Sequence, residues 1–431
     1  IPGMGYRAFK MQPLNNIRAK TPVTMLMSPQ TMENEFLHVS FNANGTFNTV
    51  EKATGREYKN LGFFKDSGEI GNPWEHHVPE VNETFTTLNE KADITLLHQG
   101  ELETTFKVVI NWALPESRSF DEKSRSKHLK PCKIVNLVSL KKGARWVEVN
   151  TTLDNQSEDH YLQVGFPTGI NAEFSYAQGQ FDVLKRQVAK LDYSLYDEAP
   201  MTEHPMNSFV DVTDGTHGVA ILNTGLKAYE TSGDADNTLY LTLLRCYPLR
   251  ICVTSDMQDY SGWEKGSQCL GINKFRYAFM PHTGDWEAGD VWKESERFNL
   301  HLNVAQLAPT ANGKNSLVKS FLELAEENLH VSAVKRSESG EGYVIRLFNP
   351  SDKTIKNSIR LNNGIVPITK TQSPLERQAA EFELPAYTGK PWNSAGLVTL
   401  EEKEVAPLQI KQDGFVDFEI TGKKILTIEF K

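Results

Sequence analysis

The stretch DSGEIGNPWEHH, residues 66–77, concentrates side chains that can carry chemistry. Asp66 and Glu69 offer carboxylates, Asn72 offers an amide, and two glycines permit sharp turns between them. Trp74 offers a flat apolar face, which suits stacking on a sugar ring. Loops carried by a rigid sheet often hold functional residues, so this stretch is a candidate binding wall. The alternative is a surface loop whose tryptophan packs on its own sandwich.

Two histidines close the same stretch. His76 and His77 can each donate or accept a hydrogen bond to a bound molecule. Consecutive side chains in a strand point to opposite faces, so this pair does not favour a shared metal ion.

Arg245, in the stretch LTLLRC, is a second candidate because it ends an apolar run. A guanidinium at a strand end suits bidentate hydrogen bonding to a ligand, and a structural ion pair explains it as well. Arg276 and His282 are interpreted as sheet and turn residues. Asp197 and Glu198 are adjacent carboxylates, which in loops are mostly solvated. No Ser-His-Asp arrangement or glycine-rich phosphate loop is recognisable.

Composition restricts the partners. The 431 residues are 39% apolar and 23% charged, which is typical of a globular protein. The net charge of −9 argues against nucleic acid, and the basic patch at residues 123–133 is interpreted as a solvated loop. No run approaches the roughly 20 apolar residues of a membrane span. Four cysteines without a CxxC spacing suit a reducing compartment. We expect a bacterial cytoplasmic protein, with a secreted or compartmental location as the alternative.

The elements that must position the candidate residues are predicted to be β-strands. Two short β-like runs flank Asp214-Gly215 within residues 204–226, and two more flank Asn44-Gly45. Both patterns are typical of hairpins. Further alternating runs occur at residues 94–99, 104–112, 134–140, 145–153, 164–166, 240–245 and 273–281. Long strands with one polar face are typical of a large antiparallel sandwich.

The polar stretch APTANGKN, residues 308–315, predicts the main domain boundary. After it, Leu317, Phe321 and Leu324 have helical spacing, which predicts a helix at residues 316–328, with a strand as the alternative for part of it. Short runs that follow predict a smaller C-terminal sandwich: residues 329–333, 343–348, 355–361, 397–405, 415–420 and 425–430.

Several stretches, taken in order, resemble the C-terminal β region of the α-mannosidases of glycoside hydrolase family 38. They are IPGMGYRAF; FNANGTFNTVEKATGREYKNLGFFKDSGEIGNPWEHH, with its hairpin, TGR turn and acidic glycine loop; EAPMTEHPMNSFVDV through GLKAYE; LTLLRCYPL; GSQCLGINKFRYAFMPHTGDW; YVIRLFNPSD; and SPLER. The resemblance covers essentially the whole chain. It implies a mostly β protein: a strand and linker from a small β domain at residues 1–31, a galactose-mutarotase-like antiparallel super-sandwich at 32–307, and a C-terminal β-sandwich at 316–431.

The resemblance also implies a retaining enzyme with zinc in an N-terminal α/β barrel. There one Asp acts as nucleophile and another carboxylic acid as acid/base, which requires two carboxyl groups roughly 5 Å apart. The family's His-x-Asp zinc motif does not occur in this sequence, and the first residue, Ile1, suggests a start inside a longer protein. We therefore expect the catalytic residues and the zinc in the parent protein's N-terminal domain, and neither in this chain.

These observations lead to two functional hypotheses from different classes. In the first, the chain forms one wall of an α-mannosidase active site and is inactive alone. Its candidate wall residues are Asp66, Glu69, Asn72, Trp74, His76 and Arg245. Its partners are an α-mannoside and the N-terminal domain, without nucleic acid or membrane, and a homo-oligomer is left open. The second hypothesis is a non-catalytic carbohydrate-binding or structural module. A mutarotase-like epimerase is a weaker third, suggested by fold alone.

Overall fold

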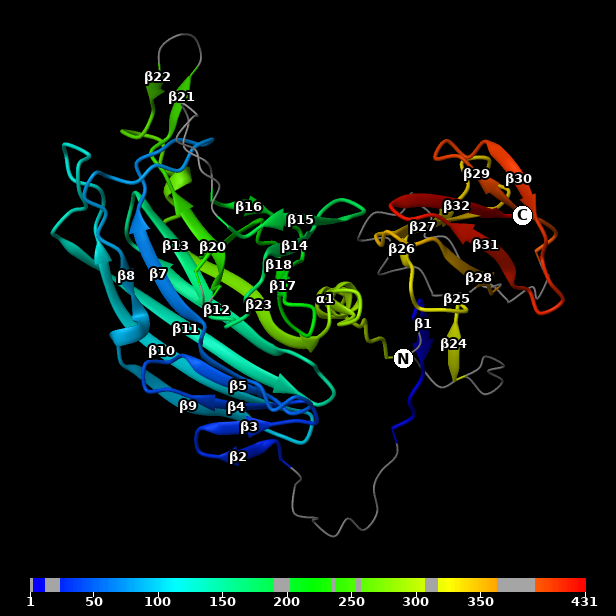
Figure 1. The fold of residues 1–431 in the computed structure, drawn as a ribbon, viewed down its shortest axis with the longest axis horizontal. Helices are drawn as coiled ribbons and strands as arrows, with labels where there is room; N and C mark the ends of the chain where they lie inside the picture. Colours follow the sequence, from blue (N-terminus) through cyan, green and yellow to red (C-terminus); the bar gives the residue numbers. More distant parts are fainter. Residues whose placement is uncertain are drawn as a thin grey trace. The chain divides into compact units, whose positions relative to one another are not determined.

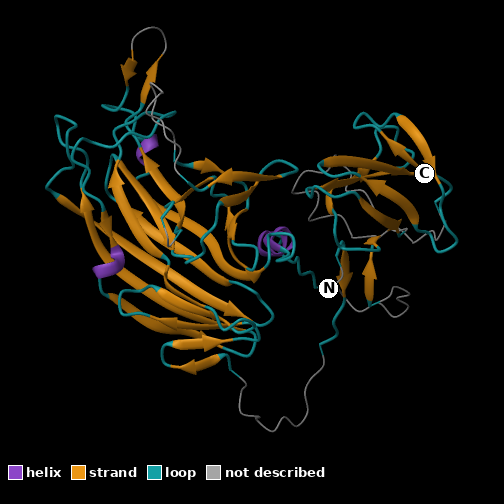
Figure 2. Ribbon diagram, viewed as in Figure 1, coloured by secondary structure: helices purple, strands orange, loops and turns teal. Residues whose placement is uncertain are grey.

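Alternating apolar and polar residues fold this chain almost entirely into antiparallel strands (Figures 1 and 2). The computed structural model describes residues 3–11, 24–189, 202–234, 237–252, 257–306, 317–362 and 392–431. The predicted mostly β class is confirmed. No helix within these described ranges is long and apolar enough to cross a membrane.

The largest sheet has nine strands. Their order across the sheet is β15 (Val183–Gln187), β14 (Phe174–Gln178), β17 (Phe209–Thr213), β18 (His217–Thr224), β23 (Gly271–Thr283), β12 (Val147–Asn155), β11 (Leu129–Lys141), β10 (Glu103–Pro115) and β9 (Ala92–Gln99). The predicted hairpin in residues 204–226 is confirmed as β17–β18, and Gly215 supplies the positive φ that its turn requires.

A six-stranded sheet carries the candidate loop. Its order is β16 (His204–Pro205), β19 (Ala228–Thr231), β20 (Leu239–Cys246), β13 (His160–Phe166), β7 (Phe63–Gly68) and β8 (Phe85–Thr86). A five-stranded sheet consists of β2 (Leu26–Ser28), β3 (Thr31–Glu33), β4 (Leu37–Phe41), β5 (Phe47–Glu51) and β6 (Glu57–Leu61). The predicted Asn44-Gly45 hairpin joins β4 to β5.

One hydrophobic core joins these sheets. Leu162, Val164 and Phe166 of β13 are fully buried in it, and so is Phe279 of the nine-stranded sheet. The rings of Phe166 and Phe279 stack with centroids 6.2 Å apart. This face of β13 therefore belongs to the sandwich interior, and the side chains that alternate with it, such as Tyr161, point the other way.

The α-helix lies elsewhere than predicted. Two short strands, β24 (Val318–Ser320) and β25 (Leu322–Leu324), lie within residues 317–328, so the predicted helix is wrong there and the strand alternative is confirmed for these parts. The observed helix is α1 (Val291–Asn299), which packs its buried face against β17 and β18. Smaller elements are the 3₁₀ helices η1 (Thr87–Asn89) and η2 (Gly266–Gln268) and the hairpin of β21 (Arg250–Cys252) and β22 (Met257–Asp259).

The chain divides into two units. The first contains the sheets described above, and the second contains the described parts of residues 1–17 and 304–431, together with Gln180–Val183. In the second unit, β1 (Gly5–Arg7) pairs with β24. The predicted boundary at residues 308–315 lies outside the described residues.

The C-terminal strands surround a separate core. A three-stranded sheet has β25, β28 (Ile355–Leu361) and β31 (Val416–Ile420); a five-stranded sheet has β26 (His330–Arg336), β27 (Tyr343–Asn349), β32 (Lys424–Phe430), β29 (Ala395–Val398) and β30 (Glu404–Leu408). Ile345, Ile359 and Ile428 are fully buried between them. The predicted strand at residues 397–405 is wrong as one element, because β29 and β30 form a hairpin there.

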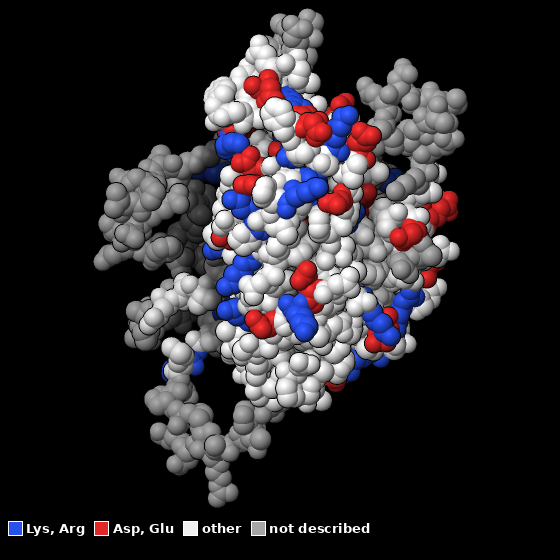
Figure 3. All heavy atoms as spheres, turned by 90° about the vertical axis from the view of Figure 1, so that its left-hand side faces the viewer, with Lys and Arg blue, Asp and Glu red and all other residues white. Residues whose placement is uncertain are grey.

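Charges of both signs are interspersed on the face drawn in Figure 3. Lysine and arginine side chains alternate with aspartate and glutamate over its visible surface, without a continuous basic track. This pattern agrees with the net charge of −9 and offers no groove for a phosphate backbone on that face.

Candidate functional site

The candidate loop, residues 69–77, follows β7 and is closed by its own backbone. The Ile70 N–H donates to the His77 carbonyl at 2.8 Å, and the Asn72 N–H donates to the Glu75 carbonyl at 3.0 Å. The Asn72 side-chain oxygen accepts the Trp74 N–H at 2.8 Å and the Glu75 N–H at 3.0 Å. Such an Asx turn fixes the backbone locally, so the loop has a defined shape.

Gly71 is required by the tightness of this turn. A Cβ atom at this position would lie 1.9 Å from the Glu75 carbonyl oxygen and 2.7 Å from the Glu69 carboxylate. No side chain fits at these distances, so only glycine permits the loop to close over Glu69.

Glu69 lies fully buried beneath the loop. One carboxylate oxygen lies 2.5 Å from His76 Nδ1 and accepts from Arg245 Nε at 2.9 Å. The other accepts the backbone N–H groups of Gly71 at 2.6 Å and His77 at 3.3 Å. Burial acts to raise the pKa of Glu69, but these donors overcome it and hold the pKa below its usual value. The carboxylate is therefore ionised, with its lone pairs already used.

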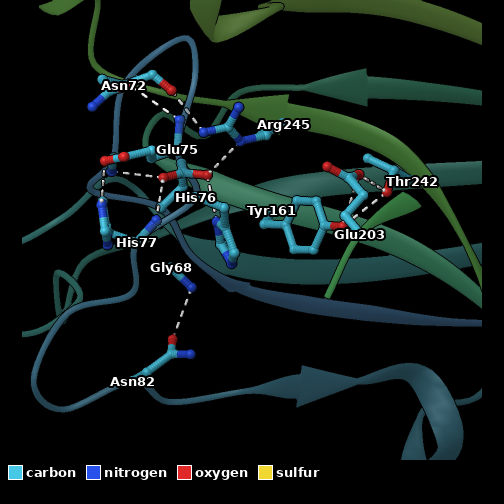
Figure 4. A network of polar contacts seen from close by, with 12 residues as sticks. Gly68, Asn72, Glu75, His76, His77, Asn82, Tyr161, Glu203, Thr242 and Arg245 are labelled. Atoms are coloured by element: carbon cyan, nitrogen blue, oxygen red, sulfur yellow. Dashed lines mark hydrogen bonds and ion pairs between the residues drawn. The ribbon is translucent and has the colours of Figure 1, made fainter. Parts of the chain in front are cut away.

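Arg245 fastens the loop from a different strand. It lies in β20, on the far side of β13 from β7, and its Nη2 donates to the Asn72 carbonyl at 2.6 Å. Its Nη1 donates more weakly to the Pro73 carbonyl at 3.4 Å. Figure 4 shows Arg245 pointing toward the loop that carries Asn72 and His76. Arg245 thus forms an ion pair with Glu69, as the second interpretation of this residue predicted, and it positions the loop.

Trp74 faces solvent from the loop surface. The residue is 59% exposed, so a large part of it faces solvent. The half-exposed Glu75 and His77 lie beside it, joined by an ion pair of 3.1 Å. The buried groups fix the loop, and the exposed indole face is free for stacking on an apolar or sugar surface.

The structure separates Asp66 from the other candidates. Its carboxylate is fully buried on the core-facing side of β7 and accepts from Arg125 Nη2 at 2.5 Å. Its second oxygen lies 2.5 Å from His160 Nδ1. The interpretation of residues 123–133 as a solvated loop is therefore wrong for Arg125, which is 4% exposed. Both oxygens of this buried carboxylate already have partners, and removing Arg125 would leave an uncompensated buried charge.

The polar network extends from the loop across β13. The His76 and Tyr161 rings lie with centroids 4.6 Å apart, and the Tyr161 hydroxyl lies 2.8 Å from Thr242 Oγ1. Burial raises the pKa of Tyr161 well above its usual value, and the nearby Glu203 adds to this, so the phenol stays protonated. It donates to Glu203 at 3.0 Å, as Figure 4 shows. Sequence reasoning missed these residues, although the alternation HYLQVGF places Tyr161 on the polar face.

The remaining sequence candidates are structural. Arg276 lies in β23 and donates to the Glu148 carboxylate at 2.8 Å. His282, also in β23, lies 2.6 Å from the Asp211 carboxylate, and both are fully buried. These are sheet residues, as predicted. Asp197 and Glu198 lie outside the described residues.

The zinc that the family resemblance implies is expected in the parent protein's N-terminal domain. Among the residues that the structure describes, no group of three or more His, Cys, Asp or Glu side chains is placed to hold a metal ion.

Two family profiles match the chain. The profile of the glycosyl hydrolases family 38 C-terminal domain matches residues 32–247, and that of the family 38 C-terminal beta sandwich domain matches residues 328–428. Together with the fold, these matches confirm the resemblance read from the sequence.

Known proteins share both sequence and fold with the chain. A protein of Halalkalibacterium halodurans, provisionally named a mannosylglycerate hydrolase, is 24% identical over 364 residues, covering 80% of this chain and 39% of that protein. An alpha-mannosidase of Saccharomyces cerevisiae is 26% identical over 239 residues, covering 54% and 19% respectively. The crystal structure of an alpha-mannosidase from Enterococcus faecalis V583 superposes with a TM-score of 0.78 at 25% identity, covering 96% and 43%. The chain thus spans less than half the length of these relatives.

Proposed function

This chain belongs to glycosyl hydrolases family 38, and on that basis we propose that it is the β portion of a zinc-dependent, retaining α-mannosidase. In this proposal it forms one wall of the active site and helps to select the α-mannoside. The relatives named as alpha-mannosidases support the substrate class, and they are more than twice as long as this chain. The reaction is assigned to the parent protein, and the cytoplasmic location stays a prediction.

The chemistry itself is assigned to residues outside this sequence. A retaining glycosidase needs a nucleophilic carboxylate and an acid/base carboxyl group roughly 5 Å apart and open to the sugar. Glu69 and Asp66 are fully buried and bonded to cationic partners, so neither is open to a sugar carbon. In this proposal zinc is likewise held by the parent protein's N-terminal domain.

The observation that carries the wall proposal is the exposure of Trp74 on a loop fixed from below. Glu69 and Arg245 hold the loop by a 2.9 Å ion pair, and Asn72 shapes its turn. A rigid aromatic face loses little conformational entropy when it stacks on a sugar, which favours a positioning role. In this proposal Trp74 contacts the mannoside, and Arg245 acts through the loop.

The test uses the longest natural chain that contains this sequence. Trp74→Ala is expected to raise KM for an aryl α-mannoside about tenfold, the equivalent of roughly 1.4 kcal/mol of lost binding, with a smaller effect on kcat. Trp74→Phe is the matched control and should retain most of the affinity. Unchanged kinetics of Trp74→Ala on aryl α-mannosides and on mannosylglycerate would exclude the wall role.

A second measurement tests the division of labour. The 431-residue chain alone is expected to leave an aryl α-mannoside intact, and the longer chain should hydrolyse it and lose activity when zinc is chelated. Hydrolysis by the short chain would contradict the proposal. If instead the short chain binds mannosides and the longer protein hydrolyses none, the chain is the non-catalytic binding module of the alternative hypothesis.

A further inference from the structure

The face of the six-stranded sheet that points away from the core carries a cluster of polar side chains. Tyr161 and Gln163 of β13 alternate with core residues, and Gln163 is paired with Thr242 of β20. Glu230 of β19 and Glu203, directly before β16, complete the cluster. Tyr161 and Gln163 are buried and the other three residues are partly exposed, so the cluster has a buried floor and an accessible rim.

Hydrogen bonds join these five residues into one row. The Tyr161 hydroxyl donates to Glu203 Oε1 at 3.0 Å, and Thr242 Oγ1 donates to the same oxygen. Gln163 Nε2 donates to the Tyr161 hydroxyl oxygen at 3.1 Å and, across β20, to Glu230 Oε2 at 3.0 Å. Figure 4 shows Tyr161 and Thr242 pointing toward Glu203. The two carboxylates are thus held at opposite ends of the row.

The row has used its donors and keeps spare acceptors. Both N–H groups of the Gln163 amide and both hydroxyl protons are engaged in these bonds. The Gln163 side-chain oxygen is buried and has no hydrogen-bond partner among the residues that the structure describes. The opposite orientation of the amide would turn its oxygen toward the Glu230 carboxylate, which offers no proton. A buried acceptor without a partner is destabilising, and a ligand that brings a donor removes that cost.

These features favour a ligand that donates several hydrogen bonds from spaced positions. Within the described ranges, neither Glu203 nor Glu230 forms an ion pair, so both carboxylates can accept further bonds. The Tyr161 hydroxyl and the Gln163 amide stand between them, so the row suits several separate donors better than one metal ion, whose ligands must converge. The hydroxyl groups of a pyranose ring are spaced in this way, and each can donate to a carboxylate or an amide oxygen.

We propose that this face of the six-stranded sheet is a second carbohydrate site, which binds the hydroxyl groups of a pyranose sugar. The sugar donates to the free oxygen of Gln163 and to the carboxylates of Glu203 and Glu230. The site adjoins the candidate loop, because the Tyr161 and His76 rings lie with centroids 4.6 Å apart. It requires neither Trp74 nor hydrolysis by the parent protein, so it stands independently of the proposed function.

The experiment titrates the 431-residue chain with methyl α-D-mannoside in a calorimeter. The wild-type chain is expected to bind the sugar. Glu230→Gln replaces one acceptor oxygen by a donating amide and is expected to raise Kd about tenfold or more. Glu230 is partly exposed, so this variant should keep the fold. Glu57→Gln, on the exposed part of β6, is the matched control and should bind the sugar as the wild type does.

Gln163→Leu tests the buried acceptor. It has a similar volume and lacks the unpartnered oxygen, so it should also raise Kd about tenfold, with circular dichroism as the check on folding. No binding by the wild-type chain, or wild-type affinity in Glu230→Gln, would overturn the proposal. It would also be overturned by a loss of binding confined to Trp74→Ala, which places the sugar at the loop. Binding of calcium chloride instead of the mannoside, lost in Glu230→Gln, would make the row a cation site and overturn it as well.

Discussion

Glu69 shows that a carboxylate that looks catalytic in the sequence can instead hold a loop in place. It is buried, and its oxygens are shared among Arg245, His76 and two backbone N–H groups. Removal of one member of a buried charge pair leaves the other uncompensated, which costs more than the pair contributes. A substitution of Glu69 should therefore lower the stability of the protein first, and affect ligand binding only through the loop.

Glu69→Gln is expected to lower the free energy of unfolding by about 3 kcal/mol, since Arg245 would keep its charge without a carboxylate. Glu75→Gln, in the exposed pair with His77, should change it by less than about 0.5 kcal/mol. Urea denaturation of the 431-residue chain measures both. Equal stability of the two variants would contradict the positioning role of Glu69.

Glu148 provides a pH prediction. Burial acts to raise its pKa, but hydrogen bonds from Arg276 and Lys141 overcome this and lower it to about 2, against 4.5 for the free side chain. A depressed carboxyl pKa adds stability above the unfolded value and loses it as pH falls through the folded value. The stability difference between wild type and Glu148→Gln should therefore shrink by about 3 kcal/mol between pH 5 and pH 2. Glu57→Gln, an exposed control, should show no such change.

Sequence patterns identified part of the residue network. The loop sequence predicted Glu69, Asn72 and His76 together because turns place near neighbours side by side. Arg245 was a separate candidate, and the structure brings it to the same loop from β20. Tyr161 and Glu203 were not predicted, because their contact depends on which strands are neighbours in the sheet. Which strands pair, and in which register, is set across the sheet, and the residue pattern within one strand carries no information about it.

At the scale of elements, a side chain can contact a strand beyond its neighbour only where the intervening strand has a small residue. His282 of β23 reaches Asp211 of β17 across β18, the strand between them, at Gly218. A Cβ atom on Gly218 would lie 2.1 Å from the His282 ring. The glycine leaves the space that this buried pair occupies.

Gly218→Ala is expected to destabilise the chain by about 2 kcal/mol, because the ring must shift within a packed interior. Gly262→Ala is the matched control, since nothing lies within 4 Å of its added Cβ atom. Thermal unfolding followed by circular dichroism distinguishes them. Identical midpoints would show that the ring moves without cost.

The elements also show where local patterns fail. The helical spacing of Leu317, Phe321 and Leu324 is real, yet β24 pairs with β1 and β25 with β28. Strand partners supplied by distant segments outweigh a weak local preference. The observed helix α1 carried a usable signal, because Val291, Ser295 and Phe298 recur at helical spacing and are buried. Strands with strict alternation, such as β10 and β12, were predicted well because one face of each is buried.

At the scale of the whole molecule, two hydrophobic cores are formed by different parts of the chain. We expect two calorimetric transitions, since each unit buries its own apolar surface. Leu162→Ala should lower one transition and Ile345→Ala the other, each through a loss of about 3 kcal/mol. A single transition that both variants shift equally would show that the units unfold together.

The pairing of β1 with β24 has a consequence for biosynthesis. Gly5 faces Ser320, so 315 residues separate the partners, 320 minus 5. A ribosome that adds about 5–20 residues per second needs roughly 15–60 s between them. Throughout this interval the backbone donors and acceptors of β1 lack their final neighbours and are open to chaperones or to another nascent chain. Strand β1 can therefore complete its backbone hydrogen bonds only after β24, 315 residues further along the chain, has been translated.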